Sequence, residues 1–128
     1  MSAVDDLLAV ARSRLDRVTP ERLGAEIADG AIVVDTRPVD QRTADGSLPG
    51  ALVIDRNVLE WRLDPTCPHR HPAITHHDHR VIVVCNEGYS SSLAAATLRD
   101  LGLARATDLV GGYRQWREHQ PADPAPGG

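Results

Sequence analysis

The stretch that most constrains this chain runs from residue 80 to residue 98. It opens with Val81-Ile82-Val83-Val84, a run of branched apolar residues typical of a strand buried on both faces. It closes with an alanine- and leucine-rich segment, which favours a helix and has serines at its start. Between the two, Cys85 stands at the carboxyl end of the strand, before a short polar loop with one glycine.

This junction predicts a reactive cysteine. A strand that leads directly into a helix aims the N–H groups of the loop and the positive helix end at one small volume. A thiolate there is stabilised, so we expect the pKa of the Cys85 thiol to lie below the free value of about 8.5. The alternative is a small core residue, because free cysteines are often buried. The position at a strand end, where ligands gather in open α/β sheets, favours the reactive interpretation.

Helices and strands are expected to alternate along the rest of the chain. Helices are expected over residues 4–17, from Thr19-Pro20-Glu21 to Gly30, over 58–63 after a cap at Asn57, from the Cys85 loop to about Asp100, and through Tyr113, Trp116 and His119. Strands are expected at residues 31–35, 51–55, 81–84 and 106–110, with a polar loop over 38–50. Such alternation predicts an α/β protein with a mainly parallel sheet.

Composition argues against several classes of protein. The length of 128 residues predicts one domain, and the net charge of −4 gives no footprint for a nucleic-acid partner. No apolar stretch approaches the ~20 residues of a membrane span, so we expect no membrane partner. The start of the chain, with Asp5-Asp6, is unlike a signal peptide. The two cysteines, Cys67 and Cys85, cannot form a disulfide framework, so we expect a cytoplasmic protein.

Four short motifs recur here in the order seen in rhodanese-like domains, and the chain resembles that family. The motifs are Asp35-Thr36-Arg37, Gly46 with Pro49-Gly50-Ala51, the Cys85 loop, and Gly111-Gly112 with Trp116. The resemblance covers roughly residues 19–120, after an N-terminal helical extension over 1–18 and before a tail over 121–128 that we expect to be disordered. It implies a three-layer α/β/α domain around a central, mainly parallel five-stranded sheet.

The resemblance also implies sulfurtransferase chemistry. Cys85 would take the sulfane sulfur of a donor such as thiosulfate as a persulfide, and then pass it to a thiophilic acceptor such as cyanide or a thiol. The loop residues expected to bind substrate are Asn86, Glu87, Gly88, Tyr89, Ser90 and Ser91.

Within this loop the side chains have different expected roles. Gly88 lets the backbone approach closely, and Tyr89 is expected to line the rim. Ser90 and Ser91 either donate hydroxyl hydrogen bonds toward the sulfur or cap the following helix. For Ser92 we expect capping or an exposed surface position.

The residue at the end of the Cys85 loop separates this interpretation from a cysteine-dependent phosphatase. Those enzymes place an arginine after a cysteine and five intervening residues, and its planar fork clamps a phosphate dianion. In this chain Ser91 occupies that place, and Glu87 would repel a dianion. The sequence therefore disfavours phosphatase and arsenate reductase activity.

Charged residues near the predicted site have structural alternatives. Asp35 and Arg37 are interpreted as a buried ion pair or hydrogen-bond network that supports the site, rather than as reacting groups. Positive charge for a donor could come from Arg56, Arg62 or Arg114, although each also fits a solvated surface arginine.

Cys67 and a histidine-rich segment, His69 to His79, form the remaining cluster. Cys and His clusters can bind zinc, but this spacing matches no closed structural site, so we expect a solvated loop and no metal. Nothing points to an organic cofactor. A role for Cys67 as a second thiol that resolves the persulfide stays open.

Two other functions remain open beside the enzyme. One is a non-catalytic rhodanese module that binds or regulates, against which the presence of Cys85 argues. The other is a sulfur-relay carrier whose donor and acceptor are proteins. The expected partners are accordingly a small sulfane-sulfur donor with a thiol or cyanide acceptor, or a relay protein.

Overall fold

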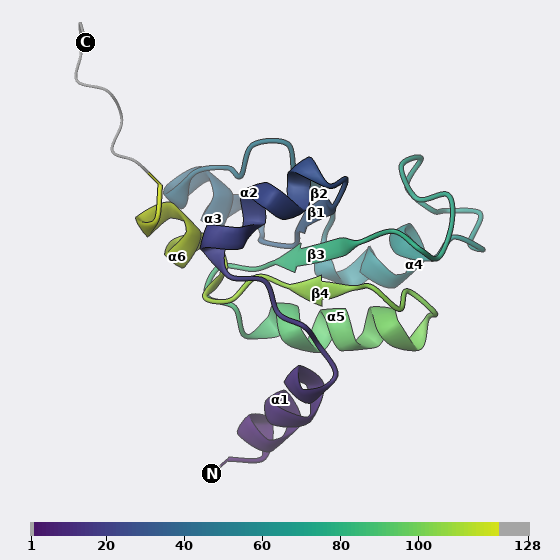
Figure 1. Ribbon diagram of the computed structural model, residues 1–128, viewed down its shortest axis with the longest axis horizontal. Coiled ribbons are helices and arrows are strands. Elements are labelled where there is room, and N and C mark those ends of the chain that lie inside the picture. The colour runs from purple at the N-terminus through teal and green to yellow at the C-terminus, as the bar shows by residue number, and fades with distance from the viewer. Residues whose placement is uncertain (1, 121–128) are drawn as a thin grey trace, which may run out of the picture.

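The computed structural model describes residues 2–120, in which helices alternate with short strands (Figure 1). The helices are α1 (Ala3–Ser13), α2 (Pro20–Ala28), α3 (Val39–Asp45), α4 (Leu59–Leu63), α5 (Ser90–Asp100) and α6 (Gly112–Glu118), with a 3-10 turn η1 (Arg56–Val58) before α4. The strands are β1 (Ile32–Asp35), β2 (Leu52–Val53), β3 (Val81–Val84) and β4 (Thr107–Asp108).

The strands form one sheet in the order β2-β1-β3-β4, and every pair of neighbours is parallel. The predicted α/β class with a mainly parallel sheet is therefore confirmed. Asp35 at the end of β1 lies opposite Val84 at the end of β3. The loops that follow these two strands thus leave the same edge of the sheet, where ligands gather in open α/β sheets.

Helices cover both faces of the sheet, because the alternating side chains of β3 point to opposite sides. Val81 and Val83 pack in a core cluster with α4 and α5, and Ile82 and Val84 pack in a second cluster with α2 and α6. Helix α1 packs on α5 and lies on the outer side of that layer (Figure 1). The frame is therefore a three-layer α/β/α sandwich.

The expectation of a five-stranded sheet is wrong, because the sheet has four strands among residues 2–120. At the edge beside β4 a single bridge pairs Val18 with Leu109. The backbone N–H of Val18 donates to Asp108, and the N–H of Val110 donates to Val18. Pairing stops there because Pro20, which lacks an N–H, begins α2 two residues later.

Several predicted boundaries also differ. The first helix ends at Ser13 rather than near residue 17, and the chain then extends toward β4. The predicted polar loop over 38–50 contains α3, which has no buried residue and so shows no apolar periodicity. Asp55, not Asn57, caps the turn before α4, and its carboxylate accepts the N–H of Asn57 at 2.7 Å.

Two expectations lie at the limits of what the structure describes. The predicted disordered tail over 121–128 falls outside the described residues. Within residues 2–120, none of the helices has the length and apolar content to cross a membrane.

Candidate active site

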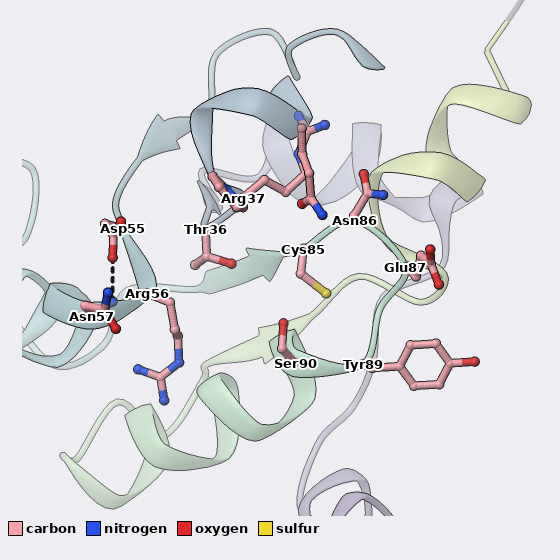
Figure 2. Close-up of a pocket in the computed structure, with 12 residues that line it drawn as sticks. Thr36, Arg37, Asp55, Arg56, Asn57, Cys85, Asn86, Glu87, Tyr89 and Ser90 are labelled. Atoms are coloured by element: carbon pink, nitrogen blue, oxygen red, sulfur yellow. Dashed lines mark hydrogen bonds between the residues drawn. The ribbon is translucent and has the colours of Figure 1, made fainter. Parts of the chain in front are cut away.

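Cys85 lies at the carboxyl end of β3, and a loop of four residues leads from it into α5. The Cys85 Sγ accepts hydrogen bonds from the backbone N–H of Gly88 at 3.2 Å and of Ser91 at 3.4 Å. Figure 2 shows the sulfur directed toward Ser90 and the first turn of α5. The predicted convergence of loop and helix N–H groups on this sulfur is therefore present.

The pKa of the Cys85 thiol reflects two opposing influences. Burial is the largest single one, and it raises the pKa by disfavouring the charged form. The side chains of Ser91 and Ser90, with the N–H groups of Ser91 and Gly88, favour the thiolate and together outweigh burial. The pKa of Cys85 is consequently lowered from its ordinary value, in the predicted direction.

The sulfur lies beside a cavity of about 560 Å³. Cys85 is only 7% exposed, yet it lines this cavity rather than the closed core. The other lining residues are Thr36, Arg37, Pro38, Gln41, Asp55, Arg56, Asn57, Asn86, Glu87, Tyr89 and Ser90 (Figure 2). Tyr89 is 60% exposed, and its ring points away from Cys85 in Figure 2. A small molecule in the cavity would meet the Cys85 sulfur at its wall.

The start of α6 holds the Cys85 loop from behind. The N–H of Tyr113 donates to the Cys85 carbonyl at 2.9 Å, and the N–H of Arg114 donates to the Asn86 carbonyl at 3.1 Å. A Cβ on Gly112 would lie 2.5 Å from the Cys85 carbonyl oxygen, and one on Gly88 would lie 2.7 Å from the backbone nitrogen of Gly111. Backbone therefore packs directly on backbone, which explains why glycines stand at these positions.

The charged residues considered from the sequence lie in different places. Arg56 lines the cavity and pairs with Glu60 at 2.7 Å. Arg114 pairs with Glu87 at 3.2 Å, so the acidic group in the loop has a cationic partner. Arg62 donates to the carbonyl of His69 and is not among the residues that line the cavity.

Asp35 and Arg37 form a buried ion pair with a distance of 2.8 Å. Arg37 also donates to the carbonyl of Gly46 at 2.9 Å, and its guanidinium lies 3.9 Å from the centre of the Tyr113 ring. The pair therefore ties the end of β1 to the segment after α3 and to α6, in a geometry suited to support rather than reaction.

The serines of α5 reveal a residue that sequence reasoning missed. The hydroxyls of Ser91 and Ser92 both donate to the Asp108 carboxylate, at 2.8 and 2.7 Å. Ser92 is fully buried, so the expectation of a capping or exposed Ser92 is wrong. The available signal was a lone acid in the apolar run 106–110, which demands a buried partner.

The histidine-rich segment forms a connection with local hydrogen bonds. The Nδ1 of His71 accepts the N–H of Ala73, and the Nδ1 of His76 accepts the N–H of Asp78. The rings of His76 and His79 stack at 3.8 Å. Cys67 accepts the N–H of His69, and it is not among the residues that line the Cys85 cavity.

A parallel sheet with a cysteine loop at its carboxyl edge is typical of α/β proteins that use a cysteine at this position. Comparison with known proteins identifies the family within that class. The rhodanese-like domain model matches residues 19–119. The chain therefore belongs to the rhodanese-like domain family, as its motifs predicted.

Named relatives extend over most of the chain. The thiosulfate sulfurtransferase GlpE of Stutzerimonas stutzeri (strain A1501) is 33% identical over 107 residues, which are 84% of this chain and 89% of the relative. The protein of the same name from Pseudomonas fluorescens (strain SBW25) is 36% identical over 115 residues, with 87% and 93% covered. These similarities confirm the prediction of a rhodanese-type enzyme.

Two solved structures show the same fold. The human single-domain sulfurtransferase TSTD1 matches with a TM-score of 0.68 and 27% identity, over 82% of this chain and 97% of that one. RPA3614 from Rhodopseudomonas palustris CGA009 matches with a TM-score of 0.81 and 29% identity, over 92% and 91%. It is described as a protein of unknown function, possible tyrosine phosphatase.

Proposed function

We propose that this protein transfers a sulfane sulfur from thiosulfate, or a donor of the same type, to a thiophilic acceptor through a persulfide on Cys85. The observation that carries the proposal is the Cys85 sulfur, which accepts two backbone N–H groups at the wall of an open cavity. The names of the GlpE relatives support thiosulfate as the donor.

The first step is displacement at sulfur, as in thiol–disulfide exchange. The Cys85 thiolate attacks the outer sulfur of thiosulfate, a sulfur–sulfur bond forms to Cys85, and the bond to the departing sulfite breaks. Sulfite carries away the bonding electron pair, so the enzyme retains a negatively charged persulfide. The N–H groups of Gly88 and Ser91, which already point at the Cys85 sulfur, stabilise that charge at the cavity wall.

The second step returns the enzyme to its starting state. An acceptor such as cyanide attacks the terminal sulfur of the persulfide, the sulfur–sulfur bond breaks, and its electron pair returns to Cys85 as the thiolate. Cyanide leaves as thiocyanate, and a thiol acceptor would leave as a persulfide after losing its proton. No redox cofactor takes part, because the electrons balance within each displacement.

The cavity holds a cationic partner for the charge of the donor. Arg56 is the arginine of the lining whose side chain is part-exposed, whereas Arg37 is buried in its pair with Asp35. We assign Arg56 to the anionic end of the donor, since a guanidinium matches sulfonate-type oxygens. The Arg114–Glu87 pair reduces the repulsion that an unpaired Glu87 would exert.

Phosphoryl transfer fits the same loop poorly. The position where a cysteine-dependent phosphatase carries its arginine is occupied by Ser91, whose hydroxyl donates to Asp108. The loop therefore presents N–H groups to one sulfur atom and lacks the planar cation that clamps a dianion. The phosphatase description given to RPA3614 is therefore not extended to this chain.

Intact mass spectrometry tests the proposal. After incubation with thiosulfate, the protein should gain one sulfur atom and lose it on addition of cyanide, with formation of thiocyanate. Cys85→Ser should show neither change and should keep the wild-type fold, because serine adds no bulk. Cys67→Ser is the matched control and should behave as wild type. Failure of every sulfane donor to add mass would favour a non-catalytic binding module.

A sulfur-relay carrier would give a different result in the same experiment. Such a carrier would gain its sulfur from a cysteine desulfurase much faster than from thiosulfate, and would pass it to a protein thiol. Comparing the rates of persulfide formation with thiosulfate and with a desulfurase plus cysteine therefore distinguishes the two. Equal or faster loading by thiosulfate supports the small-molecule enzyme.

A further inference from the structure

Two arginines that precede the family match lie against the active-site loop. Arg12 in α1 donates to the carbonyl of Gly88 at 2.8 Å, and Arg17 in the following segment donates to the same oxygen at 3.1 Å. Gly88 in turn directs its N–H at the Cys85 sulfur. The chain before residue 19, where the rhodanese-like match begins, thus contacts a residue that binds the nucleophile.

Arg17 also anchors a buried carboxylate under the same loop. Its Nε lies 2.8 Å from Oδ1 of Asp108, and its Nη2 lies 3.1 Å from Oδ2. Asp108 is fully buried, and Oδ2 also accepts the hydroxyls of Ser91 and Ser92. Arg12 adds a bond from its Nε to the Ser92 hydroxyl at 3.1 Å. The first turn of α5 is therefore bound to Asp108, and Asp108 to Arg17.

These contacts involve both residues whose N–H groups donate to the Cys85 sulfur, Gly88 and Ser91. Gly88 is held through its carbonyl by two guanidinium groups, and Ser91 is held through its hydroxyl by Asp108. We propose that Arg17, assisted by Arg12, is a positioning residue that aims the Gly88 and Ser91 N–H groups at Cys85 and neutralises Asp108 beneath them. The segment that carries Arg12 and Arg17, which precedes the matched domain, thus holds the active-site loop in its working conformation.

The charge on Arg17 has a direct consequence for the nucleophile. Without it, Asp108 would be an unpaired buried carboxylate bound to Ser91, whose N–H donates to the Cys85 sulfur, and a nearby like charge disfavours ionisation of the thiol. The other charged groups that line the cavity keep their partners in an Arg17 variant. Arg37 stays with Asp35, Arg56 with Glu60 and Glu87 with Arg114, while the Asp55 carboxylate accepts the N–H of Asn57.

The test measures alkylation of Cys85 against pH in Arg17→Met, which removes the charge and keeps most of the aliphatic stem. The Arg17→Met variant and the reference protein with Arg17 intact both carry Cys67→Ser, so that Cys85 is the one thiol that reacts with iodoacetamide. We expect the midpoint of the alkylation profile to rise by about one pH unit, and the rate below the midpoint to fall about tenfold. Arg14→Met is the matched control, because Arg14 forms an exposed pair with Asp100 and should leave the midpoint unchanged.

Two further variants separate positioning from loss of fold. Arg17→Lys keeps the charge but loses the planar fork, so its midpoint should lie between those of wild type and Arg17→Met. If thermal unfolding shows that Arg17→Met is not folded, Arg12→Met decides, since it keeps the Arg17–Asp108 pair and should raise the midpoint by a smaller amount. An unchanged midpoint in the folded variant would overturn the proposal.

The last measurement is the rate of sulfur transfer, and its interpretation rests on the function proposed above. Single-turnover persulfide formation by Arg17→Met should be about tenfold slower than wild type at low pH and should approach the wild-type rate above both midpoints. A deficit that is equal at every pH would contradict an effect through thiolate formation. Alkylation needs no sulfur donor, so a wild-type protein that gains no sulfur would refute the proposed function and leave the positioning test intact.

Discussion

At the scale of single residues, the pKa of Cys85 is lowered because its hydrogen-bond donors outweigh its burial. A sulfur that is 7% exposed would have a raised pKa if burial acted alone. The side chains of Ser91 and Ser90 and the N–H groups of Ser91 and Gly88 reverse that direction. In the mechanism proposed above, the same N–H groups would also stabilise the charge of the persulfide.

The lowered pKa of Cys85 predicts its reactivity profile. Because the folded pKa lies below that of a free thiol, the thiolate should persist as pH falls below about 8.5 and be lost only through the folded pKa. Iodoacetamide alkylation of the Cys67→Ser protein should therefore have its midpoint below that value. The same titration in concentrated urea is the control and should return the midpoint of a free thiol. A folded midpoint at or above the unfolded one would contradict the assignment.

Arg56 is expected to act on binding of the donor. Arg56→Ala should raise KM for thiosulfate several-fold with little change in kcat, because the lost interaction lies away from the reacting sulfur. Arg62→Ala is the control, since Arg62 does not line the cavity and should leave KM unchanged. Steady-state thiocyanate formation measures both constants. A fall in kcat at constant KM would remove Arg56 from donor binding.

At the scale of elements, the site depends on the direct contact between the Cys85 loop and the start of α6. Two N–H groups of α6 donate to the carbonyls of Cys85 and Asn86, and Gly112 permits the approach. The loop can then turn its own N–H groups inward to the sulfur, because its carbonyls are already paired on the outer side.

Gly112→Ala tests this contact. The backbone of Gly112 has φ of +64°, and its added Cβ would meet backbone atoms that cannot move aside, so we expect a loss of about 2 kcal/mol or more in the free energy of unfolding. Urea unfolding measures it. Gly24→Ala is the control in a helix interior with open space around the Cβ, and it should be neutral or stabilising by up to ~1 kcal/mol. Equal stability of the two variants would contradict the packing argument.

At the scale of the whole molecule, the site is assembled from segments far apart in the chain. The Asp35–Arg37 pair links the end of β1 to Gly46 and to the Tyr113 ring. Arg17 and Asp108 link the segment after α1 to β4 and α5. The buried Asp35–Arg37 pair and the pair between part-buried Arg17 and buried Asp108 thus tie together the segments at the carboxyl edge of the sheet.

Loss of one partner of the Asp35–Arg37 pair should destabilise the fold as a whole. Arg37→Met leaves a buried carboxylate without its cation, and we expect a cost of about 3–5 kcal/mol in urea unfolding. The double variant Asp35→Asn/Arg37→Met should recover part of that loss. Arg14→Met breaks an exposed pair and should cost less than ~1 kcal/mol. A cost for Arg37→Met as small as for Arg14→Met would show that the buried pair contributes little.

Predictions that rested on local pattern agreed with the structure better than those that needed partners. Val81 to Val84 formed the buried strand, and the helix after Cys85 began at Ser90, because branched runs and alanine-rich runs carry their periodicity in adjacent residues. Helix α3 escaped prediction because it is polar and exposed. The fifth strand, which was inferred from the family resemblance, is reduced to one bridge at Val18 beside the Pro20 helix start.

The sequence alone predicted the order of most elements, the membership of the family and Cys85 as the candidate nucleophile, since these depend on neighbouring residues and short motifs. Only the tertiary structure decided that Asp108 lies beneath Ser91 and Ser92, and that Arg12 and Arg17 contact Gly88. Those partners are separated by 16 to 76 positions in the chain. Their pairing follows from how the helices pack on the sheet, which no local pattern of residues records.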